Sequence, residues 1–135
     1  MLQLDFVLTV DPWLTYEAHH DHIQTGLAVA EAVMFTGLTK IPSSDLAVDA
    51  AFKPHDIKGI IFYHTREPNQ IMDISETWEA KLAAVRCYEA QFTSQEMNQL
   101  VRALDMKAQQ VAGSESFKRG ESLKVLHTSA LHCGF

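Results

Sequence analysis

The sequence predicts an α/β fold in which helices flank a layered sheet. Apolar runs rich in β-branched and aromatic residues, at positions 2–10 and 58–65, are typical of strands. Amphipathic segments at positions 21–38, 76–91 and 94–112 are typical of helices. Because strand and helix patterns alternate along one short chain, a layered α/β architecture follows.

Composition bounds the class of protein. The chain has 135 residues, of which 47% are hydrophobic and 21% charged, so we expect one small globular domain over residues 1–135. A net charge of −6 argues against binding nucleic acid or an anionic membrane surface. No apolar run approaches the roughly 20 residues that span a bilayer. The first ten residues carry Asp5 and no basic region, unlike a signal peptide, so we expect a cytoplasmic protein.

The first half of the chain predicts a strand, a helix and a long connection. The nearly continuous apolar run at 2–10 predicts a strand buried on both faces of a parallel sheet. Asp21 can cap a helix that extends to about Leu38 and ends near Gly37. Residues 39–56 predict a connection with one helical turn near 45–51. The predicted buried face of the helix consists of Ile23, Leu27, Ala30, Met34 and Leu38.

The middle of the chain predicts two strands and a helix. Residues 58–65 give the strongest strand pattern, and residues 70–74 predict a shorter strand. Ser75 can cap a helix over residues 76–91. Its predicted shared face consists of Trp78, Leu82, Val85 and either Cys87 or Tyr88. We expect Cys87 to be buried as a small apolar residue, since no CxxC pair or disulfide pattern is present.

The last third predicts a second helix with well-defined ends. Thr93 and Glu96 match a capping box, and the helix over residues 94–112 should end at Gly113. Residues 121–126 are compatible with either a helix or a strand. The element order is therefore strand, helix, strand, strand, helix, helix, followed by this undecided segment.

Two histidines form a candidate metal site. His19 and His22 lie three residues apart where a loop enters a helix, so a helical first turn places both imidazoles on one side. Asp21 can hydrogen-bond one of them and so fix its tautomer. Imidazole is a good ligand for Zn²⁺, and the pattern is compatible with half of a zinc site. The alternative interpretation is a solvated helix cap rich in histidine.

The context of these histidines resembles a known family. A strand ending in VLTVDP, followed by a loop and then H-x-D-H at the start of an amphipathic helix, resembles the second signature of the LmbE-like, PIG-L type de-N-acetylases. That signature is usually written H-P-D-H. Residues 58–92 resemble the family's later strand, its Asp-Ile-Ser step and a helix closing in Y-x-x-Q-F. Residues 116–122 are similar to its Arg-Gly-Glu region. The chain therefore resembles the C-terminal part of a Rossmann-like family domain.

The resemblance implies an activity and roles for three residues. In that family a single zinc ion serves the hydrolysis of an N-acetyl amide, usually on a sugar-containing or related small molecule. Carried onto this chain, His22 would be the zinc ligand. His19 would be the charged or proton-donating residue near the scissile amide, and Asp21 its orienting partner. We therefore expect a hydrolase with a small N-acetylated substrate.

Two departures from the family pattern limit this expectation. His20 stands where the family commonly has Pro. More importantly, the family's first signature, P-H-P-D-D-E, supplies two zinc ligands and the general base, and this sequence has no such string. Residues 54–56 (Pro-His-Asp) do not replace it, because they lack the second Asp and the Glu and precede a strand.

The missing signature sets three competing hypotheses for the chain. The first is a deacetylase portion with one of three protein ligands, which binds zinc weakly and has little activity alone. It would need a homo-oligomeric partner or a complementing N-terminal segment. The alternative is a non-catalytic binding or assembly domain derived from the same fold. The third is an unrelated α/β protein whose histidines bind an adventitious metal.

Three further residues have two interpretations each, and a fourth, Trp13, has one. Tyr16 is either a substrate hydroxyl or an aromatic that anchors its loop by packing. His64 and Arg66 lie where open α/β sheets place binding groups, or else form a surface polar cluster. Trp13 is expected to be a packing residue.

Overall fold

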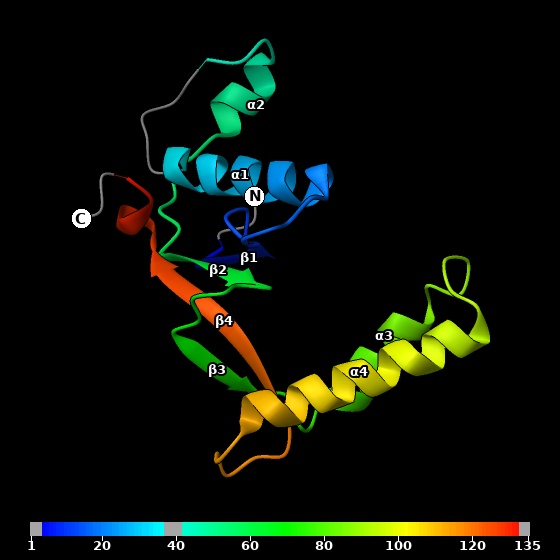
Figure 1. Cartoon of the computed structure of the whole chain (residues 1–135). Helices are drawn as coiled ribbons and strands as arrows, with labels where there is room; N and C mark the ends of the chain where they lie inside the picture. Colours follow the sequence, from blue (N-terminus) through cyan, green and yellow to red (C-terminus); the bar gives the residue numbers. More distant parts are fainter. Residues whose placement is uncertain (1–3, 37–41, 133–135) are drawn as a thin grey trace. The chain divides into compact units, whose positions relative to one another are not determined.

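The computed structural model describes residues 4–36 and 42–132 (Figure 1). Its four strands form one sheet in the order β1-β2-β4-β3. The strands are β1 (Phe6–Val10), β2 (Gly59–Tyr63), β3 (Gln70–Asp73) and β4 (Gly120–His127). β1 runs parallel to β2, and β2 runs antiparallel to β4. The predicted α/β class is confirmed, and the undecided segment at 121–126 is a strand.

Helices and the two compact units complete the architecture. The helices are α1 (His20–Phe35), α2 (Leu46–Ala51), α3 (Trp78–Arg86) and α4 (Ser94–Ala112), with a 3₁₀ turn, η1, at Thr128–Leu131. One compact unit lies within Met1–Pro68 and Leu123–Phe135, and the other within Asn69–Ser122. No helix among the described residues combines the length and hydropathy required to cross a bilayer.

The first unit has its core between α1 and the strands β1 and β2. Ala30 and Val33 of α1 pack with Ile60 and Phe62 of β2, and Phe62 is only 1% exposed. β2 is rich in β-branched and aromatic residues that fit a buried strand surface. This packing fixes α1 against the sheet, so the core sets the position of the loop and helix start that carry the histidines.

The predicted face of α1 is rotated in the structure. Gly26, Ala30 and Val33 are buried, whereas Leu27 is exposed. The physical reason is that small residues let the helix approach the end of β1 closely, and the larger Leu27 cannot occupy that contact. The prediction that Asp21 caps the helix is also wrong, because α1 begins at His20 with His19 at the N-cap position. The predicted end at Gly37 and Leu38 lies outside the described residues.

Replacing Gly26 with alanine should destabilise the first unit. A Cβ at this position would lie 2.6 Å from the Val10 carbonyl oxygen and 2.8 Å from Pro12 Cδ. Because a backbone oxygen cannot yield, we expect Gly26→Ala to lower the free energy of unfolding by about 1–3 kcal/mol. Helix propensity alone would make Gly26→Ala stabilising, because alanine favours the helix more than glycine does. Ala32→Gly, at an exposed position of α1, measures the size of this propensity difference. Urea unfolding of both variants checks this, and a stabilised Gly26→Ala protein would contradict the close contact.

The expectation that β1 is buried on both faces is wrong. Phe6 is 52% exposed and Leu8 is 60% exposed. β1 stands at one end of the strand order, and within the described part of the chain it pairs only with β2. α1 covers one face of the strand, where Val7 packs against the core. On the other face Phe6 and Leu8 therefore remain open, whereas Val10 at the end of the strand is buried.

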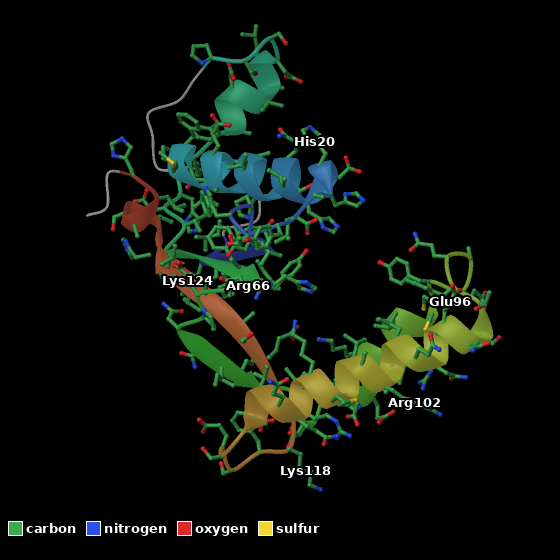
Figure 2. All side chains as sticks on the ribbon, viewed as in Figure 1. His20, Arg66, Glu96, Arg102, Lys118 and Lys124 are labelled. Carbon is green, nitrogen blue, oxygen red and sulfur yellow. The ribbon has the colours of Figure 1, made fainter. Side chains whose placement is uncertain are left out.

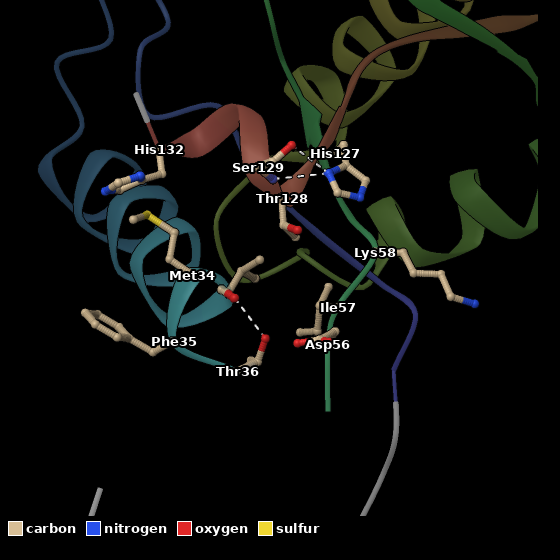
Figure 3. A pocket seen from close by; sticks show the side chains of 11 residues that line it. Met34, Phe35, Thr36, Asp56, Ile57, Lys58, His127, Thr128, Ser129 and His132 are labelled. Carbon is tan, nitrogen blue, oxygen red and sulfur yellow. Dashed lines mark hydrogen bonds between the residues drawn. The ribbon is translucent and has the colours of Figure 1, made fainter. Parts of the chain in front are cut away.

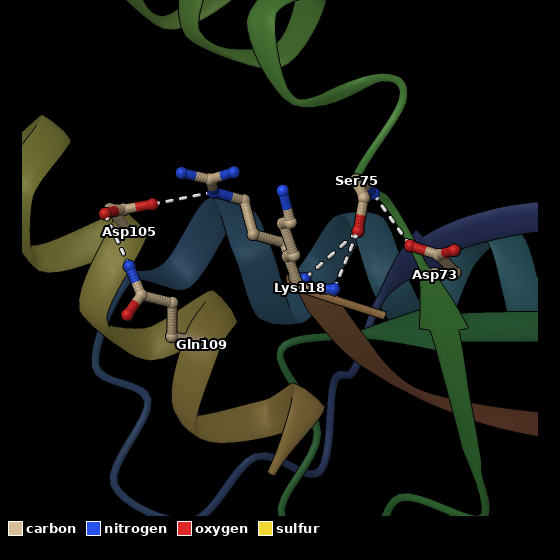
Figure 4. A network of polar contacts seen from close by, with 6 residues as sticks. Asp73, Ser75, Asp105, Gln109 and Lys118 are labelled. Atoms are coloured by element: carbon tan, nitrogen blue, oxygen red, sulfur yellow. Dashed lines mark hydrogen bonds and ion pairs between the residues drawn. The ribbon is translucent and has the colours of Figure 1, made fainter. Parts of the chain in front are cut away.

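The second unit is built on α3 and α4, which lie side by side in Figure 1. Trp78 and Leu82 are buried there with Ile74 and Ala108, as the sequence predicts for the first two. Ser75 is not the predicted cap, since Thr77 takes that position. The Ser75 hydroxyl oxygen instead accepts hydrogen bonds from the backbone N–H groups of residues 118 and 119, both at 3.1 Å (Figure 4).

Arg119 joins the two helices of the second unit. Its Nε donates to Asp105 Oδ1 at 2.7 Å, and its guanidinium lies 4.9 Å from the centre of the Trp78 ring.

α3 ends at Arg86, earlier than predicted, and Cys87 is exposed. The prediction of a buried Cys87 is therefore wrong, because the helix face that would bury it stops one residue before it.

The capping box of α4 is confirmed and should depend on pH. Thr93 N–H donates to Glu96 Oε2 at 2.8 Å, and Glu96 N–H donates to the Thr93 hydroxyl at 3.3 Å. These bonds favour the ionised carboxylate and hold the pKa of Glu96 below its ordinary value, the backbone N–H of Thr93 contributing most. A lowered acid pKa means that the stabilisation is complete above the ordinary pKa and is lost as pH falls through the lowered one.

The Thr93→Ala variant tests this pH dependence. The variant loses the hydroxyl that donates to Glu96 Oε2 at 2.7 Å and keeps the backbone donor. We expect the titration midpoint of the Glu96 carboxyl carbon, followed by NMR, to rise part of the way towards its ordinary value. A midpoint unchanged from the wild type would contradict a contribution of the hydroxyl to the capping box.

Candidate functional site

The loop between β1 and α1 begins at the carboxyl end of the parallel strands. Asp11 N–H donates to the Tyr63 carbonyl at 3.1 Å, which ties the loop start to the end of β2. The Asp11 carboxylate accepts from Trp13 N–H at 2.9 Å and so fixes a tight turn. Glu17 N–H then donates to the Leu14 carbonyl at 3.1 Å. Backbone and carboxylate bonds therefore shape the loop.

Tyr16 sits at the reversal of this loop. Its φ is 68°, in the left-handed region that is uncommon for residues other than glycine. Its side chain is 95% exposed, so the interpretation that Tyr16 anchors the loop by packing is wrong. The conformation at Tyr16 turns the chain so that Glu17 faces the start of α1. A role for the Tyr16 hydroxyl towards a substrate stays a prediction.

The two histidines lie together, as their spacing predicts. His19 N-caps α1, and the His22 and Ile23 N–H groups donate to its carbonyl at 3.1 and 3.3 Å. The imidazoles of His19 and His22 stack with ring centres 4.3 Å apart and planes 16° apart. Figure 2 marks this end of α1 by its label on His20. The two imidazole rings therefore lie together on one side of the helix start.

Glu17 holds this arrangement, a role that the sequence pattern did not predict. One carboxylate oxygen accepts from His22 Nδ1 at 2.9 Å and the other accepts from His19 N–H at 2.7 Å. The bond to the His22 ring, followed by the bond to His19 N–H, holds the pKa of Glu17 below its ordinary value. When a carboxylate is bonded to Nδ1, the other ring nitrogen, Nε2, is left to coordinate a metal. This is the usual arrangement of a histidine that ligates a metal.

Asp21, the predicted orienting partner, lies in the first turn of α1 and is exposed. The carboxylate that contacts an imidazole is that of Glu17, five residues before His22. The role of Asp21 therefore stays a prediction. The acid in the loop before H-x-D-H is visible in the sequence, but only the reversal at Tyr16 brings it to the histidine.

The described residues do not complete a metal centre. Within residues 4–36 and 42–132, no group of three or more His, Cys, Asp or Glu side chains is placed to hold a metal ion. Residues 54–56 do not supply ligands here, since the His55 ring donates to the Leu4 carbonyl at 2.9 Å instead. The chemistry of the donor set thus fits one histidine ligand with its supporting carboxylate, and not a closed zinc site.

Other candidate residues lie at the carboxyl end of β2. His64 has a φ of 56° and its ring meets that of Tyr63 edge-on, 5.4 Å between centres. Arg66 lines a pocket of about 250 Å³ together with Asp11 and Trp13. Trp13 packs edge-on against Phe62 but is 59% exposed, so it is not a buried packing residue. The loop carrying the histidines therefore borders a pocket that has both charged side chains and an aromatic wall.

A larger cavity lies elsewhere on the same unit. It has a volume of about 690 Å³ and is lined by residues such as Val33, Thr36, Ile57 and His127 (Figure 3). Val33 and Thr36 lie at the C-terminal end of α1, and a helix of 16 residues spans roughly 24 Å. The cavity is therefore remote from His19 and His22, and we do not assign it to their chemistry.

Comparisons with known proteins give relatives of one activity. A diacetylchitobiose deacetylase from Thermococcus kodakarensis is 49% identical over 86 residues, which cover 64% of this chain and 32% of that protein. The structure of an N,N'-diacetylchitobiose deacetylase from Pyrococcus horikoshii, in complex with an inhibitor, is 31% identical with a TM-score of 0.82. That likeness covers 97% of this chain and 49% of the other.

More distant structures share only the fold. A 4-carboxy-2-hydroxymuconate hydratase from Pseudomonas putida is 16% identical, with a TM-score of 0.64 over 92% of this chain and 52% of its own. No family model matches the sequence. The chain thus spans about a third of the curated relative and about half of the solved structures. Because the same fold carries a hydratase, the fold alone does not decide the reaction.

Proposed function

Because this chain is a homologue of the diacetylchitobiose deacetylases of the LmbE/PIG-L family, we propose that it forms part of a zinc-dependent hydrolase. The reaction is removal of an acetyl group from an N-acetylated amino sugar. In this proposal His22 is the zinc ligand of the chain. His19 is the residue that stabilises developing charge and donates a proton.

The observation that carries the proposal is the contact of Glu17 with both histidines. A histidine ligand works best when its second ring nitrogen is held, and Glu17 Oε2 holds His22 Nδ1 at 2.9 Å. The stacked His19 ring lies beside that of His22, within reach of a substrate bound at the same metal. A solvated helix cap would need neither the carboxylate pairing nor the stacking.

His19 and Glu17 have separate tasks in this proposal. A zinc ion bound at His22 would supply Lewis acidity towards the acetyl carbonyl. Protonated His19 would place positive charge beside the developing oxyanion and carry a proton for the leaving amine nitrogen. Glu17 would fix the tautomer of His22 and, through His19 N–H, the first turn of α1.

The remaining ligands come from outside the described residues in this proposal. Two more protein ligands and a general base would complete the site, as the family's first signature does. They are supplied either by a complementing segment or by a second copy of the chain. The relatives extend well beyond the matched region, which is consistent with the former.

A chimera tests the proposal directly. The 86 matched residues of the Thermococcus kodakarensis deacetylase are replaced by those of this chain. We expect the chimera to bind one zinc ion and to release acetate from N,N'-diacetylchitobiose, whereas this chain alone does neither efficiently. A folded chimera that holds no zinc and releases no acetate would contradict the proposal.

The alternative function is a non-catalytic binding or assembly domain on the same fold. One observation favours it: the described side chains do not bring together three metal ligands. The chimera experiment distinguishes the two functions. A chimera that folds and binds zinc but leaves the amide intact would favour the non-catalytic domain.

A further inference from the structure

The pocket of about 250 Å³ lies where β1 and β2 end. Because the two strands are parallel, their carboxyl ends meet at one edge of the sheet, where open α/β sheets bind ligands. The loop that starts at Asp11 on this pocket ends at His19. The pocket and the histidines are therefore opposite ends of the same short loop, in one compact unit.

Trp13 gives this pocket a fixed aromatic wall. Its ring meets the buried ring of Phe62 edge-on, with centres 5.5 Å apart and planes 78° apart. Its backbone N–H is held by the Asp11 carboxylate at 2.9 Å. The side chain nevertheless remains 59% exposed. A large apolar ring that is held in place but not covered can act as a platform for a flat apolar ligand face.

The charges around this platform are mixed. Asp11 is buried and keeps a carboxylate in the pocket, while Arg66 and Lys124 bring two cations (Figure 2). Lys124 Nζ lies 3.9 Å from Glu67 Oε2, too far for a hydrogen bond. For the side chain of Arg66, the described part of the chain offers neither an ion pair nor a hydrogen bond. The pocket thus offers hydrogen-bond donors, from Arg66 and Lys124, together with an acceptor, the Asp11 carboxylate.

This combination selects the chemistry of the ligand. A polyphosphate would meet the negative charge of Asp11, and a wholly apolar ligand would leave the cations without partners. A sugar ring satisfies both demands, since its C–H face can lie on the indole while its hydroxyls donate to Asp11 and accept from Arg66. The volume lies below the roughly 300–1,000 Å³ of sites for drug-sized ligands, which suits a single ring.

We propose that the pocket bounded by Trp13, Asp11 and Arg66 binds the pyranose ring of an N-acetylated amino sugar. The inference rests on the proposed function, since it assigns the substrate's ring to a subsite at the start of the loop that ends at the histidines. It adds Trp13 as the platform and Asp11, Arg66 and Lys124 as the groups that recognise hydroxyls. None of the four belongs to the metal-binding pair.

Binding of N,N'-diacetylchitobiose to the full chain, without metal, tests the subsite. The chain has two tryptophans, and Trp78 is buried in the core of the second unit. Sugar-dependent emission in the wild type therefore reports on Trp13, and we expect a shift to shorter wavelength that is absent in Trp13→Phe. By calorimetry, Trp13→Ala should weaken sugar binding at least tenfold and Arg66→Gln several-fold.

A matched variant and one comparison make the result decisive. Arg102→Gln removes an exposed cation of α4 that does not line the pocket, and it should leave sugar binding unchanged. Unweakened binding by both Trp13→Ala and Arg66→Gln, or no sugar-dependent heat in the wild type, overturns the subsite. If instead sugar binds through Trp13 while the zinc-loaded chimera releases no acetate, the subsite stands and the proposed deacetylase fails.

Discussion

Replacing His22 with alanine in the active chimera is expected to remove both its zinc and its deacetylase activity. A catalytic zinc site with three protein ligands binds metal far less well when it drops to two. His19→Ala should retain zinc and lower kcat by about 10² to 10⁴, because the lost group stabilises charge and moves a proton. Zinc content measured beside kcat separates the roles. If His19→Ala empties the site and His22→Ala leaves it filled, the assignment is reversed.

The two neighbouring carboxylates provide a matched pair for the same assay. Glu17 contacts both His19 and His22, so Glu17→Gln should lower zinc affinity or activity by about 10- to 100-fold. Asp21→Asn changes an exposed acid in the first turn of α1. If Asp21→Asn has the larger effect, the orienting role belongs to Asp21, as the family resemblance implies, and not to Glu17.

The largest effect on stability is expected from Phe62→Ala. Phe62 is 1% exposed and packs among Ala30, Val33 and Ile60 in the first unit. Loss of its ring leaves a cavity, and we expect a cost of about 3–5 kcal/mol. That is a large part of the roughly 5–15 kcal/mol by which a domain is stable. Urea unfolding followed by circular dichroism measures it.

Phe35→Ala is the control for this substitution. Phe35 is on the same unit, at the last residue of α1, and its side chain is about half-exposed. Its removal deletes the same atoms from a site that solvent already reaches, so the cost should be much smaller. Equal losses in the two variants would contradict the placement of Phe62 at the centre of the core.

Local patterns predicted the parts of this structure that depend on local interactions. The capping box of Thr93 and Glu96 forms as predicted, because its bonds join residues three apart. The imidazoles of His19 and His22 share one side for the same reason. In both cases the backbone of a single helical turn determines the geometry, and neighbours elsewhere in the chain change it little.

Predictions that depended on distant neighbours succeeded less often. The apolar run of β1 indicated burial on both faces, but burial depends on which elements cover a strand, and Leu8 is open. Asp21, the nearer acid in sequence, was predicted to hydrogen-bond one of the two imidazoles, and its role stays a prediction. Glu17 reaches the His22 ring only because the chain reverses at Tyr16 with a positive φ, and no residue pattern predicts that conformation at a tyrosine.

In the proposed zinc site, the shared carboxylate of Glu17 would couple metal affinity to the fraying of a helix end. One oxygen holds His19 N–H at the N-cap position of α1 and the other holds the His22 ring. When the first turn unwinds, the His22 imidazole is no longer held in one orientation. Binding the metal would then cost the conformational entropy of ordering that turn again. The apparent zinc affinity of the proposed site would therefore scale with the fraction of molecules whose first turn is intact. Stronger helix initiation would tighten zinc binding without any change in the ligands.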